Sequence, residues 1–267
     1  MMDYLRRNAA PLSAEVWEAL DHAVVQVARH VMAARRVAKL DGPKGWDYVA
    51  ARLGTLTPCA TKEGMAAVCV PDVVLLPEIR ADFILPWAEI EAYERGAPAL
   101  DTNAAEAAAR EVALAEDRLA FYGEPIGGGF LTAPGSPHVR IGDWSKPGQV
   151  VVDIVKAVET LDKLGRPGPY EAVLGTGGYY AYLQAIEDGG YPVVRHIESI
   201  LAGVHRSMVL RTPGALFSTG ADDFILTVGG DLAVGYREHD KEIIRLFCVE
   251  TLAAQTLTPE AVCLFEQ

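Results

Sequence analysis

The sequence lacks long apolar runs and has few basic residues. No stretch approaches the roughly 18 apolar residues of a membrane-spanning helix, and charges occupy the N-terminal positions where a signal peptide has its apolar centre. The 267 residues include 24 Lys and Arg against 36 Asp and Glu, a net charge of −12. The longest basic cluster is ARRVAK, whereas nucleic-acid backbones require basic patches. These absences predict a cytoplasmic protein with neither a membrane nor a nucleic acid as partner.

Cysteine is also scarce. The four cysteines lie at positions 59, 69, 248 and 263, without a C-x-x-C pair and without a histidine at metal-ligand spacing. This pattern favours reduced thiols, mostly buried, over a metal site. We therefore expect neither a metal nor a cofactor.

A recognisable catalytic set is absent. The six histidines are dispersed, with no H-E-x-x-H motif and no cysteine or serine partner nearby in the sequence. One stretch, YEAVLGTGGYYAYLQAIE at 170–187, runs from an apolar strand through glycines into a helix, as a phosphate-binding turn does. Gly175 and Gly177 fit the dinucleotide fingerprint, but Tyr180 occupies the third glycine position. The favoured interpretation is a tight strand-to-helix turn, with a nucleotide site as the alternative.

Half of the residues are hydrophobic, which is enough for a large core. Helical periodicity predicts one helix from Ser13 to about Leu40, and a clearer one that begins with a capping pair at Asn103 and Glu106. Residues 49–74 have weak periodicity and scattered prolines, which predict an extended β excursion. Further helices are predicted at 87–96, 148–165 and 191–201, and strands at 73–86 and from 204 to 265.

Long helices and an extended excursion without a catalytic set indicate an assembly protein, and the residues resemble one family. The similar segments are DYLRRNAAPLSAEVWEAL, GPKGWDY, LLPEIRADFILPWAEIEAYERG, AAREVALAEDRLAFYG, GPYEAVLG and LTVGGDLAVGYREHDKEIIRLFCVETLAAQTLTPEAVCL. They follow one another along the whole chain in the order and at the spacing of the encapsulins, once described as linocin-type bacteriocins. The resemblance implies an α+β fold of the Hong Kong 97 phage capsid type, and a shell protein that is not an enzyme.

Encapsulins assemble into closed icosahedral shells in bacteria or archaea and enclose cargo enzymes that carry a short C-terminal targeting peptide. The resemblance therefore implies two partners for this chain. One is the chain itself, in about sixty copies for the smallest shell, and the other is such a cargo protein. The family's cargoes are peroxidases, ferritin-like proteins and hemerythrin-like proteins, so oxidative-stress defence or iron storage is implied through the family alone.

The resemblance also divides the chain into segments. It implies an N-terminal arm and the start of the peripheral domain over residues 1–48. An extended loop that clasps a neighbour would satisfy its backbone groups by pairing with that neighbour's strand. The remaining segments are this loop at 49–74, the peripheral domain at 75–169 with its spine helix at 103–122, the axial domain at 170–203 and a C-terminal β meander at 204–267.

Cargo docking in the family uses an inner groove between the N-terminal helix and a C-terminal strand, where an apolar peptide lies extended. Lys39 stands where several relatives have an aspartate, which disfavours a basic peptide tail. The alternative is that Leu232 and Val234 belong to the core and that Arg35 pairs with a neighbouring acid. The matching positions are Trp17, Arg35, Lys39, Asp231, Leu232, Val234 and Tyr236.

A pore is the second site that the resemblance implies. In the family, the loop after the axial helix surrounds the fivefold opening of the shell. Fivefold repetition of two acidic residues in this loop would make a ring that favours cations. The matching positions are Glu187, Asp188, Gly189, Gly190 and Tyr191.

Two alternatives to a nanocompartment shell are open from the sequence. One is a soluble nucleotide- or flavin-dependent enzyme built around LGTGGYYA. The other is a true phage capsid protein, which shares the fold.

Overall fold

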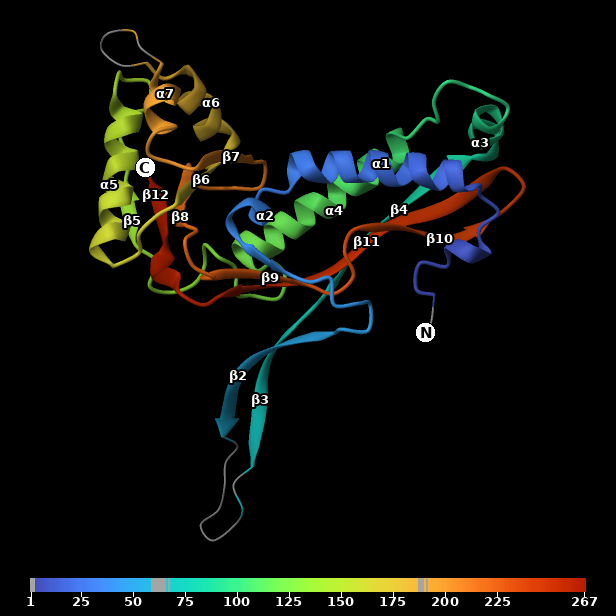
Figure 1. The fold of residues 1–267 in the computed structure, drawn as a ribbon, viewed down its shortest axis with the longest axis horizontal. Helices are drawn as coiled ribbons and strands as arrows, with labels where there is room; N and C mark the ends of the chain where they lie inside the picture. The colour runs from blue at the N-terminus through green and yellow to red at the C-terminus, as the bar shows by residue number, and fades with distance from the viewer. Residues whose placement is uncertain (1–2, 59–65, 67, 187–189, 191) are drawn as a thin grey trace.

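The computed structural model describes residues 3–58, 66, 68–186, 190 and 192–267. It consists of two lobes and a hairpin that projects away from them (Figure 1). Each lobe is a five-stranded β-sheet covered by helices. The chain therefore mixes helices and sheets, as the sequence predicts.

The sheet of the first lobe is built around one long strand, β11. Its first part pairs with β4 on one side and β10 on the other, and residues 252–256 pair with β9. β9 in turn pairs in parallel with β1. The strands are β1 (Lys39–Asp41), β4 (Glu78–Pro86), β9 (Phe224–Val228), β10 (Ala233–His239) and β11 (Ile243–Thr256).

Two long helices cover this sheet. α1 (Ala14–Val31) begins where the Ser13 hydroxyl accepts a hydrogen bond from the backbone N–H of Val16. α4 (Asn103–Tyr122) buries many alanines, which lets it lie close to both α1 and the sheet. Shorter elements complete the lobe: η1 (Arg7–Ala9), α2 (Ala34–Val37) and α3 (Trp87–Glu94).

The second lobe has the strand order β5-β12-β8-β6-β7. α5 buries Val150, Ile154 and Leu161 at helical spacing in the same core as Leu174 and Phe265 of the sheet. The elements are β5 (His138–Arg140), α5 (Gln149–Lys163), β6 (Tyr170–Gly175), α6 (Thr176–Gln184), α7 (Val193–Ile197), β7 (Gly203–Ser207), β8 (Gly214–Ser218), η2 (Pro259–Ala261) and β12 (Val262–Glu266).

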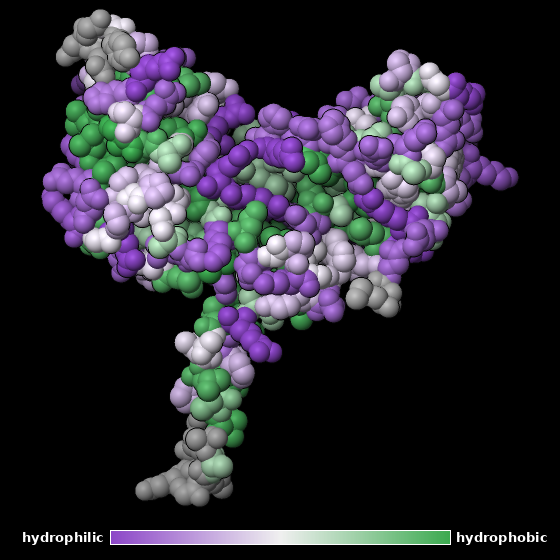
Figure 2. Space-filling view, in the orientation of Figure 1, coloured by the Kyte–Doolittle hydropathy of each residue, from purple (hydrophilic) through white to green (hydrophobic). Residues whose placement is uncertain are grey.

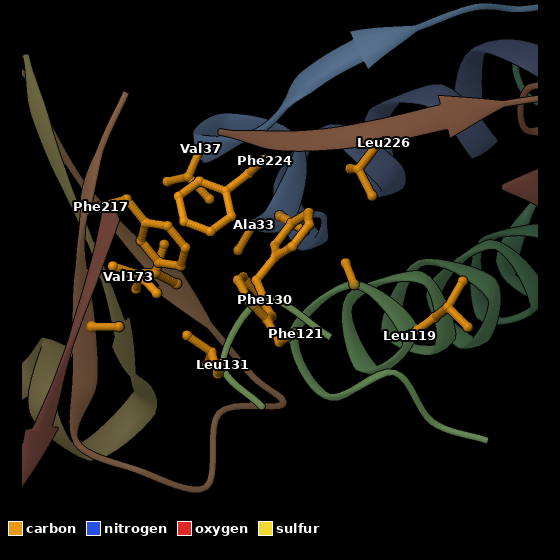
Figure 3. Close-up of a cluster of buried hydrophobic side chains, with 14 of the residues drawn as sticks. Ala33, Val37, Leu119, Phe121, Phe130, Leu131, Val173, Phe217, Phe224 and Leu226 are labelled. Atoms are coloured by element: carbon orange, nitrogen blue, oxygen red, sulfur yellow. The ribbon is translucent and has the colours of Figure 1, made fainter. Parts of the chain in front are cut away.

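A shared aromatic core joins the two lobes (Figure 3). Val173 and Phe217 come from the second sheet, and Phe224 comes from β9 of the first. The ring of Phe224 lies 5.1 Å from that of Phe217 and 5.3 Å from that of Phe130, both in edge-on geometry. Because each lobe contributes side chains to this one buried core, the lobes pack as one body.

The projecting hairpin consists of β2 (Ala50–Pro58) and β3 (Cys69–Leu75). Within the described residues these strands pair with each other and with no other strand. Its apolar side chains are exposed, Leu56 to 60% and Val70 to 52%, and green, hydrophobic residues alternate with white and purple ones along the projection in Figure 2. The β excursion predicted at 49–74 is thus present, and it leaves an apolar surface without a partner in the isolated chain.

The helix predicted from Ser13 to Leu40 is interrupted. α1 ends at Val31, α2 is one turn long, and β1 begins at Lys39. The cause is the buried carboxylate of Asp117, which accepts hydrogen bonds from the backbone N–H groups of Ala33 and Ala34 at 2.9–3.1 Å. These N–H groups therefore bond outside the helix, and the chain turns.

The start of α4 also differs from the predicted capping pair. Thr102, not Asn103, precedes the helix, and its hydroxyl donates to Glu106 at 2.7 Å. The backbone N–H of Asn103 donates to Asp101 instead. Glu106 thus takes part in the helix start as expected, with a different partner.

The strands after residue 203 do not follow one another in a single sheet. β8 and β12 belong to the second sheet, whereas β9, β10 and β11 belong to the first. The segment SMVLRT at 207–212 has the composition of a strand in the sequence, but β7 ends at its first residue, Ser207. Alternating hydrophobicity sets which side of a strand is buried but does not select its neighbour, so this division is not readable from the pattern.

The strand-to-helix turn predicted at Gly175 is present between β6 and α6. A Cβ on Gly175 would lie 2.8 Å from the carbonyl oxygen of Thr212, and one on Gly178 would lie 2.5 Å from that of Pro213. These two glycines therefore allow close backbone packing. Gly177 faces open space.

Candidate functional site

A groove lies between α1 and the turn that precedes β10, and we call it the α1 groove. Its volume is about 410 Å³. Ala28 and Met32 are buried, Leu232 is partly buried, and Val25 is exposed. The groove is lined by Val25, Ala28, Arg29, Met32, Arg35, Arg36, Asp231 and Leu232. Apolar groups on its floor and polar groups at its margin suit an extended apolar peptide.

Arg35 forms a dense ion-pair network at one end of the α1 groove. Its guanidinium lies 2.7 Å from Glu116, 2.9 Å from Asp231 and 3.1 Å from Glu250. Burial alone would lower the pKa of Arg35, but the three carboxylates outweigh it and raise the pKa. The side chain is held in one position and forms a fixed wall of the groove.

Glu116 and Glu250 are fully buried beneath Arg35. Burial, together with the neighbouring charge of Glu116, raises the pKa of Glu250 well above its usual value. One guanidinium thus faces two buried carboxyls, and Glu250 retains its proton more readily than an exposed glutamate does.

Asp117 lies next to this network and fixes the turn after α1. Besides the N–H groups of Ala33 and Ala34, its carboxylate accepts a hydrogen bond from the Ser207 hydroxyl at 3.4 Å. Burial raises the pKa of Asp117 to about 7 despite these hydrogen bonds. Asp117 therefore ties α4 to the end of α1 and to β7.

The residues predicted to bind a peptide do not all come together. Val234 is fully buried in the first lobe's core, so it does not reach the groove. Tyr236 is also buried, and its exposed edge lines a different cavity. Trp17 lies beneath the guanidinium of Arg7 at 4.6 Å, and Lys39 pairs with Asp222. Arg35, Asp231 and Leu232 are brought together in the α1 groove.

Burial explains these differences. A period-two pattern at Leu232, Val234 and Tyr236 places the side chains on one side of β10, and that side faces the core from Val234 onward. The alternative was that Leu232 and Val234 belong to the core and that Arg35 pairs with a neighbouring acid; the structure shows Val234 buried in the core and Arg35 paired with acids. Leu232 differs because it precedes the strand and is only partly buried.

Sequence reasoning missed five residues that line the groove. Four of them form a second stripe along α1 and its C-cap with the helical spacing i, i+3, i+4, i+7: Val25, Ala28, Arg29 and Met32. Arg36 lies beyond the end of α1, in α2. Helical periodicity shows this stripe in the sequence. However, the stripe adjoins the core stripe of Val24 and Val31, and periodicity alone does not separate the two.

Most of the predicted pore residues lie outside the described residues. These are Glu187, Asp188, Gly189 and Tyr191. Gly190 is described; it is exposed and has a φ of +77°, a left-handed conformation that suits glycine. The loop in question joins α6 to α7.

The glycine turn borders a cavity of about 520 Å³, lined in part by Thr176, Gly177 and Arg211. At Gly175 and Gly178 an added Cβ would meet backbone carbonyl oxygens, so these glycines serve close packing of the chain.

The part of the chain that the structure describes contains no group of three His, Cys, Asp or Glu side chains placed to hold a metal. In the same residues, no helix is both long and apolar enough to cross a membrane. Cys248 and Cys263 are free and buried, as predicted, and burial raises the pKa of each thiol to about 12, whereas Cys69 is exposed.

The fold is that of a capsid protein. The crystal structure of a virus-like particle from Pyrococcus furiosus matches with a TM-score of 0.70, over 95% of this chain and 100% of that chain, at 16% identity. The capsid of Myoviridae phage XM1 matches with a TM-score of 0.59, over 85% and 89%, at 12% identity. At these identities the likeness shows the fold alone, and it confirms the Hong Kong 97 type.

Sequence comparisons define the family. A family model described as "encapsulating protein for peroxidase" matches residues 2–253. The type 1 encapsulin shell protein of Rhodospirillum rubrum is 34% identical, over 97% of this chain and 95% of that protein. The type 1 encapsulin shell protein EncA of Myxococcus xanthus is 31% identical, over 100% and 97%. The chain belongs to the encapsulin family, and it is a shell protein.

Proposed function

We propose that the chain assembles with about sixty copies of itself into a closed icosahedral shell in the cytoplasm. The shell encloses a cargo protein, which it binds through a C-terminal targeting peptide. The α1 groove carries the cargo part of this proposal, because it combines an apolar floor with fixed polar margins.

The floor supplies most of the binding free energy. Val25, Ala28, Met32 and Leu232 present apolar surface that an extended peptide would cover with alternate side chains. Arg35 and Asp231 already bond to each other and to buried acids, so they shape the groove instead of ligating the peptide. Affinity should therefore depend on apolar complementarity at the floor.

The exposed hairpin supports the assembly part. Leu56, Val70 and other apolar side chains of the hairpin are exposed in the isolated chain, and the hairpin projects away from both lobes (Figure 1). A neighbouring copy would cover them, and it would also protect the open strand edges. We therefore propose that the loop at 49–74 forms a contact between subunits.

Leu232→Asp tests the groove. A carboxylate on the floor would have to be desolvated under an apolar peptide, so cargo loading should fall at least roughly tenfold while shells still form. The measurement is the fluorescence per shell after co-production with a fluorescent protein that ends in a Gly-, Leu- and Ser-rich tail.

Leu164→Asp is the matched control, because Leu164 is exposed at the end of α5 in the other lobe. Wild-type loading in Leu232→Asp would remove the groove assignment. Shell formation itself is tested by negative-stain microscopy and size exclusion, and a chain that stays monomeric under every condition would contradict the assembly proposal.

A further inference from the structure

A second cavity continues the α1 groove. It has a volume of about 420 Å³ and lies between the end of α1 and the second lobe, where α6 and β7 face it (Figure 1). Arg29, Met32 and Arg36 line both cavities. A peptide that follows the α1 groove past Met32 would therefore enter this second cavity, which we call the basic cleft.

The basic cleft carries positive charge in an acidic protein. The chain has a net charge of −12, yet the linings of the groove and the cleft together contain Arg29, Arg35, Arg36 and Arg206 and one acid, Asp231. Such a local reversal of sign attracts anionic partners over a distance of about 8–10 Å at physiological salt.

Three of these guanidinium groups are not neutralised. Arg35 is paired with three carboxylates, whereas Arg29, Arg36 and Arg206 form no ion pair with any acid that the structure describes. Arg36 donates to the backbone oxygen of Arg29 at 3.1 Å, and Arg206 donates to the Tyr180 hydroxyl at 2.9 Å. All three are exposed, so a carboxylate can reach them.

Both histidines of the cleft already have hydrogen-bond partners. His205 already bonds to Glu171 at 2.6 Å, and His30 bonds to the backbone oxygen of Gln26 at 2.6 Å. The arginines keep their charge at every physiological pH. The anionic preference of the cleft therefore depends on Arg29, Arg36 and Arg206.

We propose that the targeting peptide of this shell's cargo carries acidic residues beside its apolar segment, and that their carboxylates bind in the basic cleft. This inference rests on the proposed cargo function of the α1 groove. Continuity of the two cavities selects a peptide that occupies both, and charge complementarity selects Asp or Glu at the flank. Specificity follows because a basic flank would meet three like charges.

The test uses fluorescent proteins with one apolar tail, Gly-Ser-Leu-Gly-Leu-Gly-Leu, flanked by Asp-Asp-Asp, Ser-Ser-Ser or Lys-Lys-Lys. The peptide could lie in the groove in either direction. Each triplet is therefore placed before the tail in one series and after it in another. Cargo per purified shell should be roughly five- to twentyfold higher for the acidic flank than for the serine flank in one series, and lowest for lysine. Equal loading of all three flanks in both series would overturn the proposal.

The double variant Arg29→Glu/Arg36→Glu identifies the responsible charges. It should load the lysine flank better than the acidic flank, when each is compared with the serine-flanked tail in the same variant. The matched control, Arg95→Glu/Arg140→Glu, changes two exposed arginines outside both cavities and should keep the acidic preference. An unchanged preference in the Arg29/Arg36 variant would also overturn the proposal.

Two further outcomes distinguish failure of the acidic preference from failure of the proposed cargo function of the α1 groove. If no tail, including the serine-flanked one, enters shells that form normally, the cargo function of the groove fails and the acidic preference fails with it. If the Arg29/Arg36 variant forms no shells while the control does, the cleft is occupied by an acidic segment of a second copy, and the peptide proposal is overturned.

Discussion

At the scale of single residues, the main feature is a set of buried acids with little positive charge beside them. Glu116 and Glu250 share Arg35 as their cation, whereas Asp117 beside them accepts hydrogen bonds from Ala33, Ala34 and Ser207. A buried carboxylate costs free energy unless it is protonated, paired or hydrogen-bonded. Protonation, ion pairing and hydrogen bonding all occur among these residues, so the free energy of unfolding should depend on pH.

Asp117→Asn should reduce that pH dependence. The pKa of Asp117 is raised from 3.8 to about 7 in the folded chain, so between these values the folded chain holds a proton that the unfolded chain releases. Stability therefore falls as pH rises from about 4 to 7, by about 1.4 kcal/mol for each unit of pKa difference. Asparagine does not titrate, so thermal unfolding of shells at pH 5 and pH 8 should show a smaller drop in the variant.

Glu250 titrates in the same direction but is present in both proteins, so the difference between them reports Asp117. Asp143→Asn serves as the control, because Asp143 is exposed and its pKa is lowered by hydrogen bonds from Ser145. That control should not reduce the drop. Equal drops in wild type and Asp117→Asn would contradict the role given to Asp117.

At the scale of secondary-structure elements, the hairpin of β2 and β3 is the feature that a single chain leaves incomplete. Its strands have no third strand beside them within the described residues, and several of their apolar side chains are about half exposed. A two-stranded hairpin of this kind is marginal in water by itself. Contact with a neighbouring subunit would stabilise it.

Leu56→Asp should therefore block assembly without unfolding the lobes. Leu56 is 60% exposed, so a carboxylate there costs the isolated chain little, but it would be desolvated against a neighbour. We expect folded subunits by circular dichroism and no shells by size exclusion. Leu164→Asp, the exposed leucine on α5, should assemble; normal shells from Leu56→Asp would rule out the hairpin as an essential contact.

The elements were largely predictable from sequence, and their ends were less so. Periodicity located α1, α4 and α5, whereas weak periodicity and scattered prolines located the excursion at 49–74; each of these patterns is local. The break after Val31 was not predictable, since it depends on Asp117, 84 residues away from Ala33. Contacts between distant segments also decide the site. Val234 is buried with residues of α1 and α4 and does not line the groove, whereas Arg35, Asp231 and Leu232 do.

At the scale of the whole molecule, the shared aromatic core sets how the two lobes are placed. Phe217 from the second sheet and Phe224 from the first meet there, with Phe121 and Phe130 from α4 and the following loop (Figure 3). A closed shell requires each subunit to have the same shape, because small angular errors add around it. The packing of this core should therefore affect both folding and shell geometry.

Phe217→Ala should lower the free energy of unfolding by about 3–5 kcal/mol, because it removes a fully buried ring and leaves a cavity. Shells that still form should vary in size under the electron microscope. Tyr180→Ala, at a 47% exposed ring in the second lobe, should change the unfolding free energy far less. Equal stability of Phe217→Ala and wild type would show that the core does not hold the lobes together.

The position of the last strands has a consequence for biosynthesis. β12 lies between β5 and β8 in one sheet, and β11 lies between its partners in the other. Neither sheet can be completed until residues 243–266 have left the ribosome, because these residues form interior strands of both sheets. Most strand pairings in this chain join segments that are far apart in the sequence. Each such pairing can form only after its later strand has been synthesised. We therefore expect a subunit to become competent for assembly only after these strands have been made.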